Sequence, residues 1–281
     1  MRLRDVRDIQ LQSILNEQRG MSFSHVTKLR MVMQELFHQA YRSRLIPFDP
    51  SDGLRLPKNV KGSHRSITEE ERAHILEVAQ YHPSGLWVLL ILYSGLRPGE
   101  AAALQWKDID FDKNEIHVYK AVESGTNTIK TPKTTAGIRD IPMRKELRRV
   151  LWREHGEPFS LLFPTRKGTI RGPSGIWKLW NSFAKELDLH MGALEEDGRI
   201  LQHAIAPDLT TYCLRHTFCT DLQRAGVAIN IAKELMGHSS IAVTADIYTH
   251  RDSNVLHENI SRLDTPTTNQ VLKMGENWWG N

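Results

Sequence analysis

The chain has 281 residues, 40% of them hydrophobic, which is enough to bury a core and is a length often divided into a large and a small domain. Its net charge of +4 is uneven, because residues 1–66 carry 12 Lys or Arg against 6 Asp or Glu, or +6, which leaves −2 for the rest. This excess favours a polyanionic partner, nucleic acid before membrane, although a solvated surface would account for the same charge. The N-terminus does not resemble a signal peptide, and the longest apolar run, Leu86–Tyr93, is too short to cross a bilayer. We therefore expect no membrane partner and a cytoplasmic protein.

Residues 1–62 are predicted to form a small helical domain. Apolar residues recur at helical spacing over about residues 5–16, and again from Val26 to Ala40 in a longer helix that ends near Arg44. The following stretch, IPFDPSDGLRLPKNVKGSHRS, has three prolines, two glycines and no periodicity, which is typical of a linker. We place the boundary between two domains near residue 62.

Residues 63–281 are predicted to be mainly helical with a small antiparallel sheet. Thr68 and Glu71 form a capping box that opens a helix through about Ala79. The run from Gly85 to Tyr93 is apolar on all sides, as in a buried helix, and a short helix with Pro98 in its first turn holds Arg97 at its N-terminus.

Between Glu115 and Met143 the period changes to two, which predicts the strands of the sheet. Helices are expected to return at about 144–154 and 175–187, with a short extended piece at Leu161 between them. Residues 190–208 have no clear period and are interpreted as a surface insertion. Three helical pieces follow, at about 210–225, 229–236 and 241–248.

Nothing in the sequence matches a common cofactor site. The patterns GxxxxGK[ST], GxGxxG and HExxH are absent from the sequence. A metal site can be assembled from Cys213, His216 and Cys219. On one helix, however, these three side chains point in different directions, so at most adjacent pairs could share an ion. We expect no metal and no cofactor.

The same region contains groups suited to a phosphodiester. Neutralising the two non-bridging oxygens of a five-coordinate phosphorus is best done by two arginines, for which Arg97 and Arg215 are candidates. A tyrosine oxygen that becomes esterified to the phosphate keeps the bond energy of the DNA without ATP, and Tyr248 is the candidate. Taken singly, each of these residues also has an ordinary structural interpretation as a surface charge or a half-buried aromatic.

Five separate motifs, in order, resemble the successive boxes of the tyrosine recombinases, the phage-integrase family. They are SGLRPGEAAALQW (94–106), TPKTTAGIRDIPM (131–143), CLRHTFCTDL (213–222), LMGHSS (235–240) and ADIYTH (245–250). The resemblance covers roughly residues 65–250. It implies the catalytic-domain fold of that family, and it identifies the chain as a site-specific DNA recombinase.

The resemblance assigns roles to residues of this chain. Arg97 and Arg215 correspond to the family's two arginines, Lys133 to the lysine of its β-hairpin, His238 to its histidine-or-tryptophan position and Tyr248 to its nucleophile. Lys130 is a rival for the lysine role.

One position departs from the family. Three residues before Arg215, where the family usually has histidine, this chain has Tyr212. A phenol, with a reference pKa near 10, is a poor general base at neutral pH, although its hydroxyl can still form hydrogen bonds. The group that takes the proton from Tyr248 is therefore left open.

The resemblance also implies partners. In the family, four protomers hold two DNA duplexes and a C-terminal segment docks on a neighbour, for which residues 252–281 are long enough. We expect duplex DNA, a homotetramer, an accessory bending or directionality factor and a nucleoid association, and we expect residues 1–62 to be a shortened core-DNA-binding domain. Two alternatives are a type IB topoisomerase, which would relax supercoils as a monomer, and a catalytically silent DNA-binding regulator.

Overall fold

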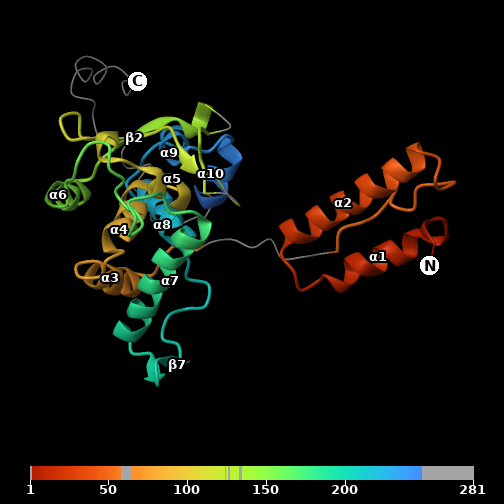
Figure 1. The fold of residues 1–281 in the computed structure, drawn as a ribbon, viewed down its shortest axis with the longest axis horizontal. Helices are drawn as coiled ribbons and strands as arrows, with labels where there is room; N and C mark the ends of the chain where they lie inside the picture. The colour runs from red at the N-terminus through yellow and green to blue at the C-terminus, as the bar shows by residue number, and fades with distance from the viewer. Residues whose placement is uncertain (1, 58–64, 124, 126, 133–134, 249–281) are drawn as a thin grey trace, which may run out of the picture. The chain divides into compact units, whose positions relative to one another are not determined.

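A computed structural model describes residues 2–57, 65–123, 125, 127–132 and 135–248, of which 246–248 are described by their backbone (Figure 1). The chain divides into two compact units, Met1–Ser63 and His64–Asn281, here called the N-terminal unit and the C-terminal unit. Helices dominate both, and the strands are short and antiparallel, as the sequence predicts. Within the described residues, no helix has the length and apolar character needed to cross a membrane.

The N-terminal unit contains the two predicted helices, α1 (Asp8–Glu17) and α2 (Phe23–Arg42). The side-chain oxygen of Ser22 accepts a hydrogen bond from the backbone N–H of His25 at 3.2 Å and so caps α2. A small apolar core lies between the helices and the segment after them: Val6, Leu11, Leu15, Val26, Met33 and Leu54. Two residues of the predicted apolar faces lie outside this core, since Ile9 is 74% and Leu36 64% exposed.

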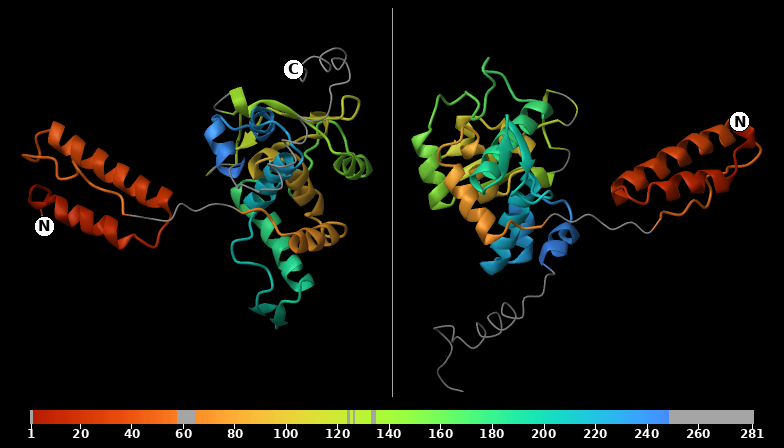
Figure 2. Two further views of the ribbon diagram at one scale, coloured as in Figure 1. Left: turned by 180° about the vertical axis from the view of Figure 1, so that it is seen from behind. Right: turned by 90° about the horizontal axis from the view of Figure 1, so that it is seen from below.

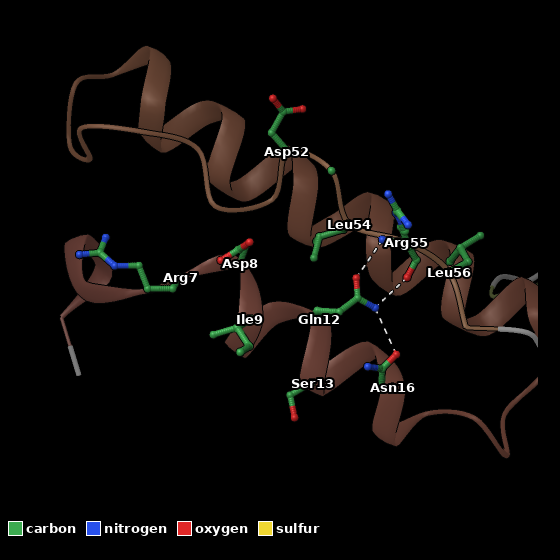
Figure 3. Close-up of a pocket in the computed structure, with 11 residues that line it drawn as sticks. Arg7, Asp8, Ile9, Gln12, Ser13, Asn16, Asp52, Leu54, Arg55 and Leu56 are labelled. Carbon is green, nitrogen blue, oxygen red and sulfur yellow. Dashed lines mark hydrogen bonds between the residues drawn. The ribbon is translucent and has the colours of Figure 1, made fainter.

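Figure 3 shows how the segment after α2 is held against α1. The side-chain amide of Gln12 donates to the carbonyl of Arg55 and accepts from its N–H, both at 2.9 Å, and it also donates to the Asn16 side chain (Figure 3). The amide thus replaces a neighbouring strand as the hydrogen-bond partner of Arg55. A hollow of about 970 Å³ lies along this contact, between α1 and residues 52–56.

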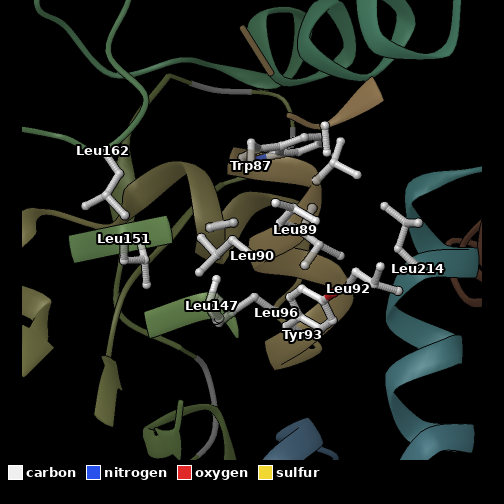
Figure 4. Packing of buried hydrophobic residues seen from close by; sticks show 14 of the residues in the cluster. Trp87, Leu89, Leu90, Leu92, Tyr93, Leu96, Leu147, Leu151, Leu162 and Leu214 are labelled. Atoms are coloured by element: carbon white, nitrogen blue, oxygen red, sulfur yellow. The ribbon is translucent and has the colours of Figure 1, made fainter. Parts of the chain in front are cut away.

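The C-terminal unit is built around α4 (Gly85–Ser94), in which every residue except Leu86 is buried. Helix α8 (Thr211–Arg224) packs against α4, and both lie at the centre of the unit in Figures 1 and 2. Figure 4 shows Leu90, Leu96 and Leu147 meeting in this core, with Leu92 on the side towards Leu214 of α8. Complete burial explains the absence of polar residues from the predicted helix.

The other helices follow the predicted order. They are α3 (Glu69–Val78), α5 (Pro98–Ala103), α6 (Lys145–Arg153), α7 (Pro173–His190), α9 (Ile229–Met236) and α10 (Ile241–Tyr248). The capping box of α3 is confirmed, because the Thr68 side chain accepts from the Glu71 N–H at 3.0 Å and Glu71 accepts from the Thr68 N–H at 2.8 Å.

The predicted small antiparallel sheet is confirmed, and its strands divide between two separate sheets. Strands β1 (Ile109–Asp110), β2 (Glu115–Val118) and β5 (Arg139–Pro142) form one sheet in that order, with Ile116 opposite Ile141. Strands β3 (Ala121–Val122) and β4 (Ile129–Lys130) form the other. Between β2 and β3, buried Lys120 forms an ion pair with Asp108 at 2.8 Å.

The predicted insertion at 190–208 contains a hairpin that the sequence analysis missed. Strands β6 (Leu194–Glu196) and β7 (Arg199–Gln202) pair through a turn in which Asp197 and Gly198 both have positive φ. Every residue of β6 is exposed, so no alternation of apolar and polar residues marks the strand. The extended piece predicted at Leu161 is a single bridge to Gln105.

Candidate active site

The first site arginine is fixed at the junction between α4 and α5. Gly95 ends α4 in the left-handed conformation, with φ 63°, and Arg97 is the N-cap of α5, as predicted. The backbone N–H of Arg97 donates to Glu100 at 2.8 Å, its Nη1 donates to the same carboxylate at 2.7 Å and its Nη2 donates to the carbonyl of Gly237 at 2.8 Å. The side chain remains 39% exposed, so it can also meet a ligand.

The second arginine comes from the buried side of α8. Arg215 is 5% exposed, and its guanidinium donates to the carbonyls of Gly95 and Met236, the latter at 2.5 Å. These contacts join α8 to the end of α4 and to the end of α9. They bring the two candidate arginines to consecutive carbonyls, those of Met236 and Gly237.

A third arginine, Arg139 on β5, completes the cluster. Its side chain is 2% exposed and its Nη2 lies 2.9 Å from the carboxylate of Glu100, which is 3% exposed. Nη1 donates to the other oxygen of Glu100 at 3.2 Å, and Nε donates to the carbonyl of Leu235 at 2.8 Å. One buried carboxylate therefore holds both Arg97 and Arg139.

The C-terminal turn of α9 gathers all three arginines. The carbonyls of Leu235, Met236 and Gly237 accept hydrogen bonds from Arg139, Arg215 and Arg97 respectively. These are carbonyls that a helix end leaves without intrahelical partners, and they carry the negative end of the helix dipole. The turn therefore supports three positive charges close together.

The charges of this cluster shift the pKa of its members. Although burial alone would raise it, hydrogen bonds and charge from Arg139, with the charge of Arg97, lower the pKa of Glu100 to about 2. Burial, with the neighbouring Arg97 and Arg139, lowers the pKa of Arg215 to about 9, so it stays charged at neutral pH. Burial and the charges of Arg215 and Arg97 lower the pKa of His238 to about 4, so its ring is neutral.

His238 connects the arginine cluster to α10. The histidine follows the C-cap Gly237 of α9 and is 9% exposed, and its Nδ1 lies 2.9 Å from the hydroxyl oxygen of the buried Thr244 in α10. Position 248 is one helical turn after Thr244 and is the last residue of α10. The backbone of the helix thus brings Tyr248 to the neighbourhood of the site.

The two lysine candidates, Lys133 and Lys130, belong to the segment that contains the β3–β4 hairpin and β5. Lys133 lies outside the described residues. Its rival Lys130 forms an ion pair with Glu123 at 2.5 Å on the β3–β4 hairpin. A cavity of about 440 Å³ lies between this hairpin and Arg97, lined also by Gly237 and Ser239.

The remaining sequence candidates lie on α8. Tyr212 occupies the first turn of the helix, three residues before buried Arg215, and is 47% exposed. Cys213 and Cys219 are buried free thiols. Among the described residues, the groups of three close ligand atoms do not include Cys213, His216 and Cys219.

Arg139 is the site residue that sequence reasoning missed. The strand pattern could have predicted its burial, because residues two apart lie on the same face of a strand. Arg139 shares one face of β5 with the apolar Ile141, and both are buried. An arginine on the inward face of a strand requires a buried partner, and Glu100 is the only acidic residue of the SGLRPGEAAALQW motif.

Replacing Gly95 by alanine is expected to destabilise the C-terminal unit by about 2–4 kcal/mol, because a Cβ is disfavoured at positive φ and overpacks its surroundings. A Cβ there would lie 2.4 Å from a ring carbon of Phe218 and 3.0 Å from the sulfur of Met236. Chemical denaturation measures the change. The control is Gly20→Ala, where no atom lies within 4 Å; equal stability of both variants would contradict the prediction.

Guanidinium groups gathered at one helix end beside a cavity can bind a phosphodiester or another phosphate-like anion. The model of the Phage integrase family matches residues 65–254, more than half of the chain. The chain therefore belongs to the phage integrase family, and the resemblance seen in the sequence is confirmed.

Individual relatives agree with this family. The tyrosine recombinase XerC-like protein of Caldanaerobacter subterraneus subsp. tengcongensis is 29% identical over 280 residues, covering 89% of this chain and 68% of that protein. The transposase from transposon Tn916 of Enterococcus faecalis is 26% identical over 278 residues, covering 90% of this chain and 64% of that protein. The chain thus spans about two thirds of the length of these relatives.

Solved structures show the same fold. The Tn1549 transposon integrase in complex with a circular intermediate DNA has a TM-score of 0.73 at 21% identity, covering 92% of this chain and 86% of that one. A lambda integrase dimer bound to a COC' core site has a TM-score of 0.59 at 18% identity, covering 89% and 83%. Family and relatives together favour a DNA-recombining enzyme over a topoisomerase or a silent regulator.

Proposed function

We propose that this protein cuts and rejoins DNA at specific sites through a covalent 3'-phosphotyrosyl intermediate, in the integration or excision of a mobile element. The observation that carries the proposal is the convergence of Arg97 and Arg215 on the carbonyls of Gly237 and Met236. These residues come from distant parts of the chain, and the helix that ends at Tyr248 begins four residues after Gly237.

In the proposed reaction the phenolic oxygen of Tyr248 attacks the scissile phosphorus. A new phosphotyrosyl ester forms, the bond to the 5' oxygen breaks, and Lys133 protonates the departing oxygen as a general acid. A 5'-hydroxyl of another strand then attacks the phosphotyrosyl ester, which restores a phosphodiester and frees the tyrosine. The number of phosphoester bonds is unchanged, so the exchange requires neither ATP nor a cofactor.

Arg97, Arg215 and His238 stabilise the charge on the phosphorane. A guanidinium has five N–H donors, and the bonds of Arg215 described above use two of them, so further donors remain for phosphate oxygens. His238, with its pKa lowered to about 4 by burial and the neighbouring arginines, is a neutral donor at pH 7. Donors fixed before the substrate binds need no reorganisation during the reaction.

The proposed substrate is duplex DNA held by both units. The surplus of +6 in residues 1–66 supports a DNA-clamping role for the N-terminal part, which we assign as the core-DNA-binding domain. The Tn1549 and lambda integrase structures contain DNA, and the second is a dimer. We propose a tetramer on two DNA sites, with an accessory DNA-bending or directionality factor.

A suicide substrate tests the proposal. A duplex nicked beside the scissile phosphate loses its short 5'-hydroxyl fragment, so the protein should remain attached to DNA in denaturing gels. Absence of an adduct would favour the silent regulator. A plasmid carrying two sites distinguishes the enzymes, because relaxation without exchange between sites would favour the topoisomerase.

Replacing Tyr212 by histidine is expected to increase the rate of cleavage about tenfold or more, because an imidazole can accept the proton of Tyr248 near neutral pH. Tyr212→Phe should change the rate much less, since it removes only a hydroxyl from a side chain that is 47% exposed. Single-turnover cleavage of the suicide substrate measures both. A histidine variant no faster than the parent would show that proton removal from Tyr248 does not limit cleavage.

A further inference from the structure

Two helix ends in the C-terminal unit bring a pair of histidines together away from the arginine cluster. His74 and Glu77 lie in the C-terminal half of α3, and His190 is the last residue of α7, which packs against α3. The Nδ1 atoms of His74 and His190 are 3.1 Å apart, and their rings meet edge to face with centroids 5.1 Å apart. The proposed DNA chemistry uses none of these residues.

The ring orientation leaves nitrogen lone pairs available in the gap. Nε2 of His190 lies 3.4 Å from a carboxylate oxygen of Glu77, whose negative charge favours a proton on that nitrogen. The Nδ1 of His190 is then the unprotonated nitrogen, and it faces the Nδ1 of His74. At 3.1 Å the two Nδ1 atoms are within hydrogen-bond distance, so a proton on the Nδ1 of His74 can join the pair, and a cation can take the place of that proton.

The dimensions and charges of the gap suit a metal ion. Two imidazole nitrogens bound to one tetrahedral zinc are about 3.3 Å apart, for bonds of about 2.0–2.1 Å. Three ligand atoms, one each from His74, Glu77 and His190, lie within 4.8 Å of one another. The C-terminal ends of α3 and α7 both lie here, and the dipoles of both helices favour positive charge at that end.

We propose that His74 and His190 bind a borderline divalent metal such as Zn²⁺ through their Nδ1 atoms. Glu77 orients His190 and contributes negative charge, and water completes the coordination. The ion would link α3 to the end of α7, four residues before the β6–β7 hairpin begins at Leu194. Its role would be structural, separate from DNA cleavage.

A second cluster of candidate ligands, around His117, provides a matched comparison with the His74–His190 pair. His117 also lies among carboxylates, with Glu115 and Asp140. There Nδ1 is 2.6 Å from Asp140 and Nε2 is 3.6 Å from Asp110. Hydrogen bonds from His117 to Asp140 raise the pKa of its ring, and both of its ring nitrogens face carboxylate oxygens, so neither faces a second histidine.

Calorimetric titration of the full chain with ZnCl₂ tests the assignment. We expect saturable binding, a higher unfolding temperature in Zn²⁺, no binding of Mg²⁺, and an affinity at least tenfold weaker in His74→Ala and in His190→Ala. His117→Ala should bind as the parent does, within about twofold. Parent-like affinity in the His74 and His190 variants, or loss of binding in His117→Ala, would overturn the proposal.

Two further measurements guard against variants that fail to fold. Co²⁺ bound to the parent should give a visible absorption band that Zn²⁺ removes, and no such band would count against nitrogen ligation. Glu77→Gln changes a side chain that is 61% exposed, so the fold should persist. We expect several-fold weaker Zn²⁺ binding in this variant, and unchanged affinity would refute the role of Glu77.

Discussion

Replacing Tyr248 by phenylalanine is expected to reduce covalent attachment to a suicide DNA substrate by at least about 10⁴-fold, because no other group then supplies the nucleophilic oxygen. Binding to the same DNA should change little, since a single hydroxyl is lost and the arginine cluster is intact. Denaturing gels report the adduct, and a gel-shift titration reports the affinity.

Tyr81→Phe is a suitable control for this experiment. Its hydroxyl donates to Glu186 at 3.2 Å on the surface of the C-terminal unit, and the variant should cleave at the rate of the parent. An adduct of undiminished yield in Tyr248→Phe would place the nucleophile elsewhere. An adduct lost in both variants would point to a general defect rather than to the chemistry of position 248.

Neutralising Glu100 is expected to lower the free energy of unfolding by about 3–5 kcal/mol, because Arg139 would remain buried without its counter-charge. Both side chains of this pair are nearly inaccessible, at 3% and 2% exposure. Glu100→Gln keeps the shape of the side chain, and chemical denaturation measures the loss. The control Glu146→Gln alters a side chain that is 57% exposed and should cost less than about 1 kcal/mol.

The double variant Glu100→Gln with Arg139→Met separates burial of charge from shape. It should lose less stability than the sum of the two single variants, because neither charge is then left alone. Strictly additive losses would show that the two charges do not interact.

Acid should affect the parent and Glu100→Gln differently. The pKa of Glu100 is lowered from 4.5 to about 2 in the folded chain by Arg139 and Arg97, although burial opposes this. Its contribution to stability is therefore complete above about pH 4.5 and is lost as the pH falls towards 2. The difference in stability between parent and variant should shrink across that interval, and a constant difference would contradict the assignment.

Local patterns predicted the helices well, because each helix carries its own signal. Thr68 and Glu71 mark the start of α3, and the apolar run of α4 reflects burial on all sides. The β6–β7 hairpin was missed because the strands are exposed, although Asp197–Gly198 is a dipeptide typical of hairpin turns. The division of the strands into two sheets depends on which strands pair, β2 with β5 and β3 with β4, and no periodicity encodes that choice.

The candidate site was predicted as a set of residues but not as an arrangement. The motifs identified Arg97, Arg215, His238 and Tyr248, whereas the bond from Arg97 to Gly237 joins residues 140 positions apart. The sequence analysis missed Arg139 because its place in the site depends on hydrogen bonds to Glu100, 39 positions earlier, and to the carbonyl of Leu235 at the end of α9. Such contacts are properties of the tertiary fold rather than of any local stretch.

The carbonyls at the end of α9 hold the three arginines together independently of DNA. Like-charged guanidinium groups repel one another, and an unsupported set would separate whenever DNA departs. Here the carbonyls of residues 235–237 offset that repulsion from within the protein. Unwinding of this single turn would remove a hydrogen bond from each of the three arginines at once, and it would leave Arg97 and Arg139 held by Glu100 and Arg215 by Gly95.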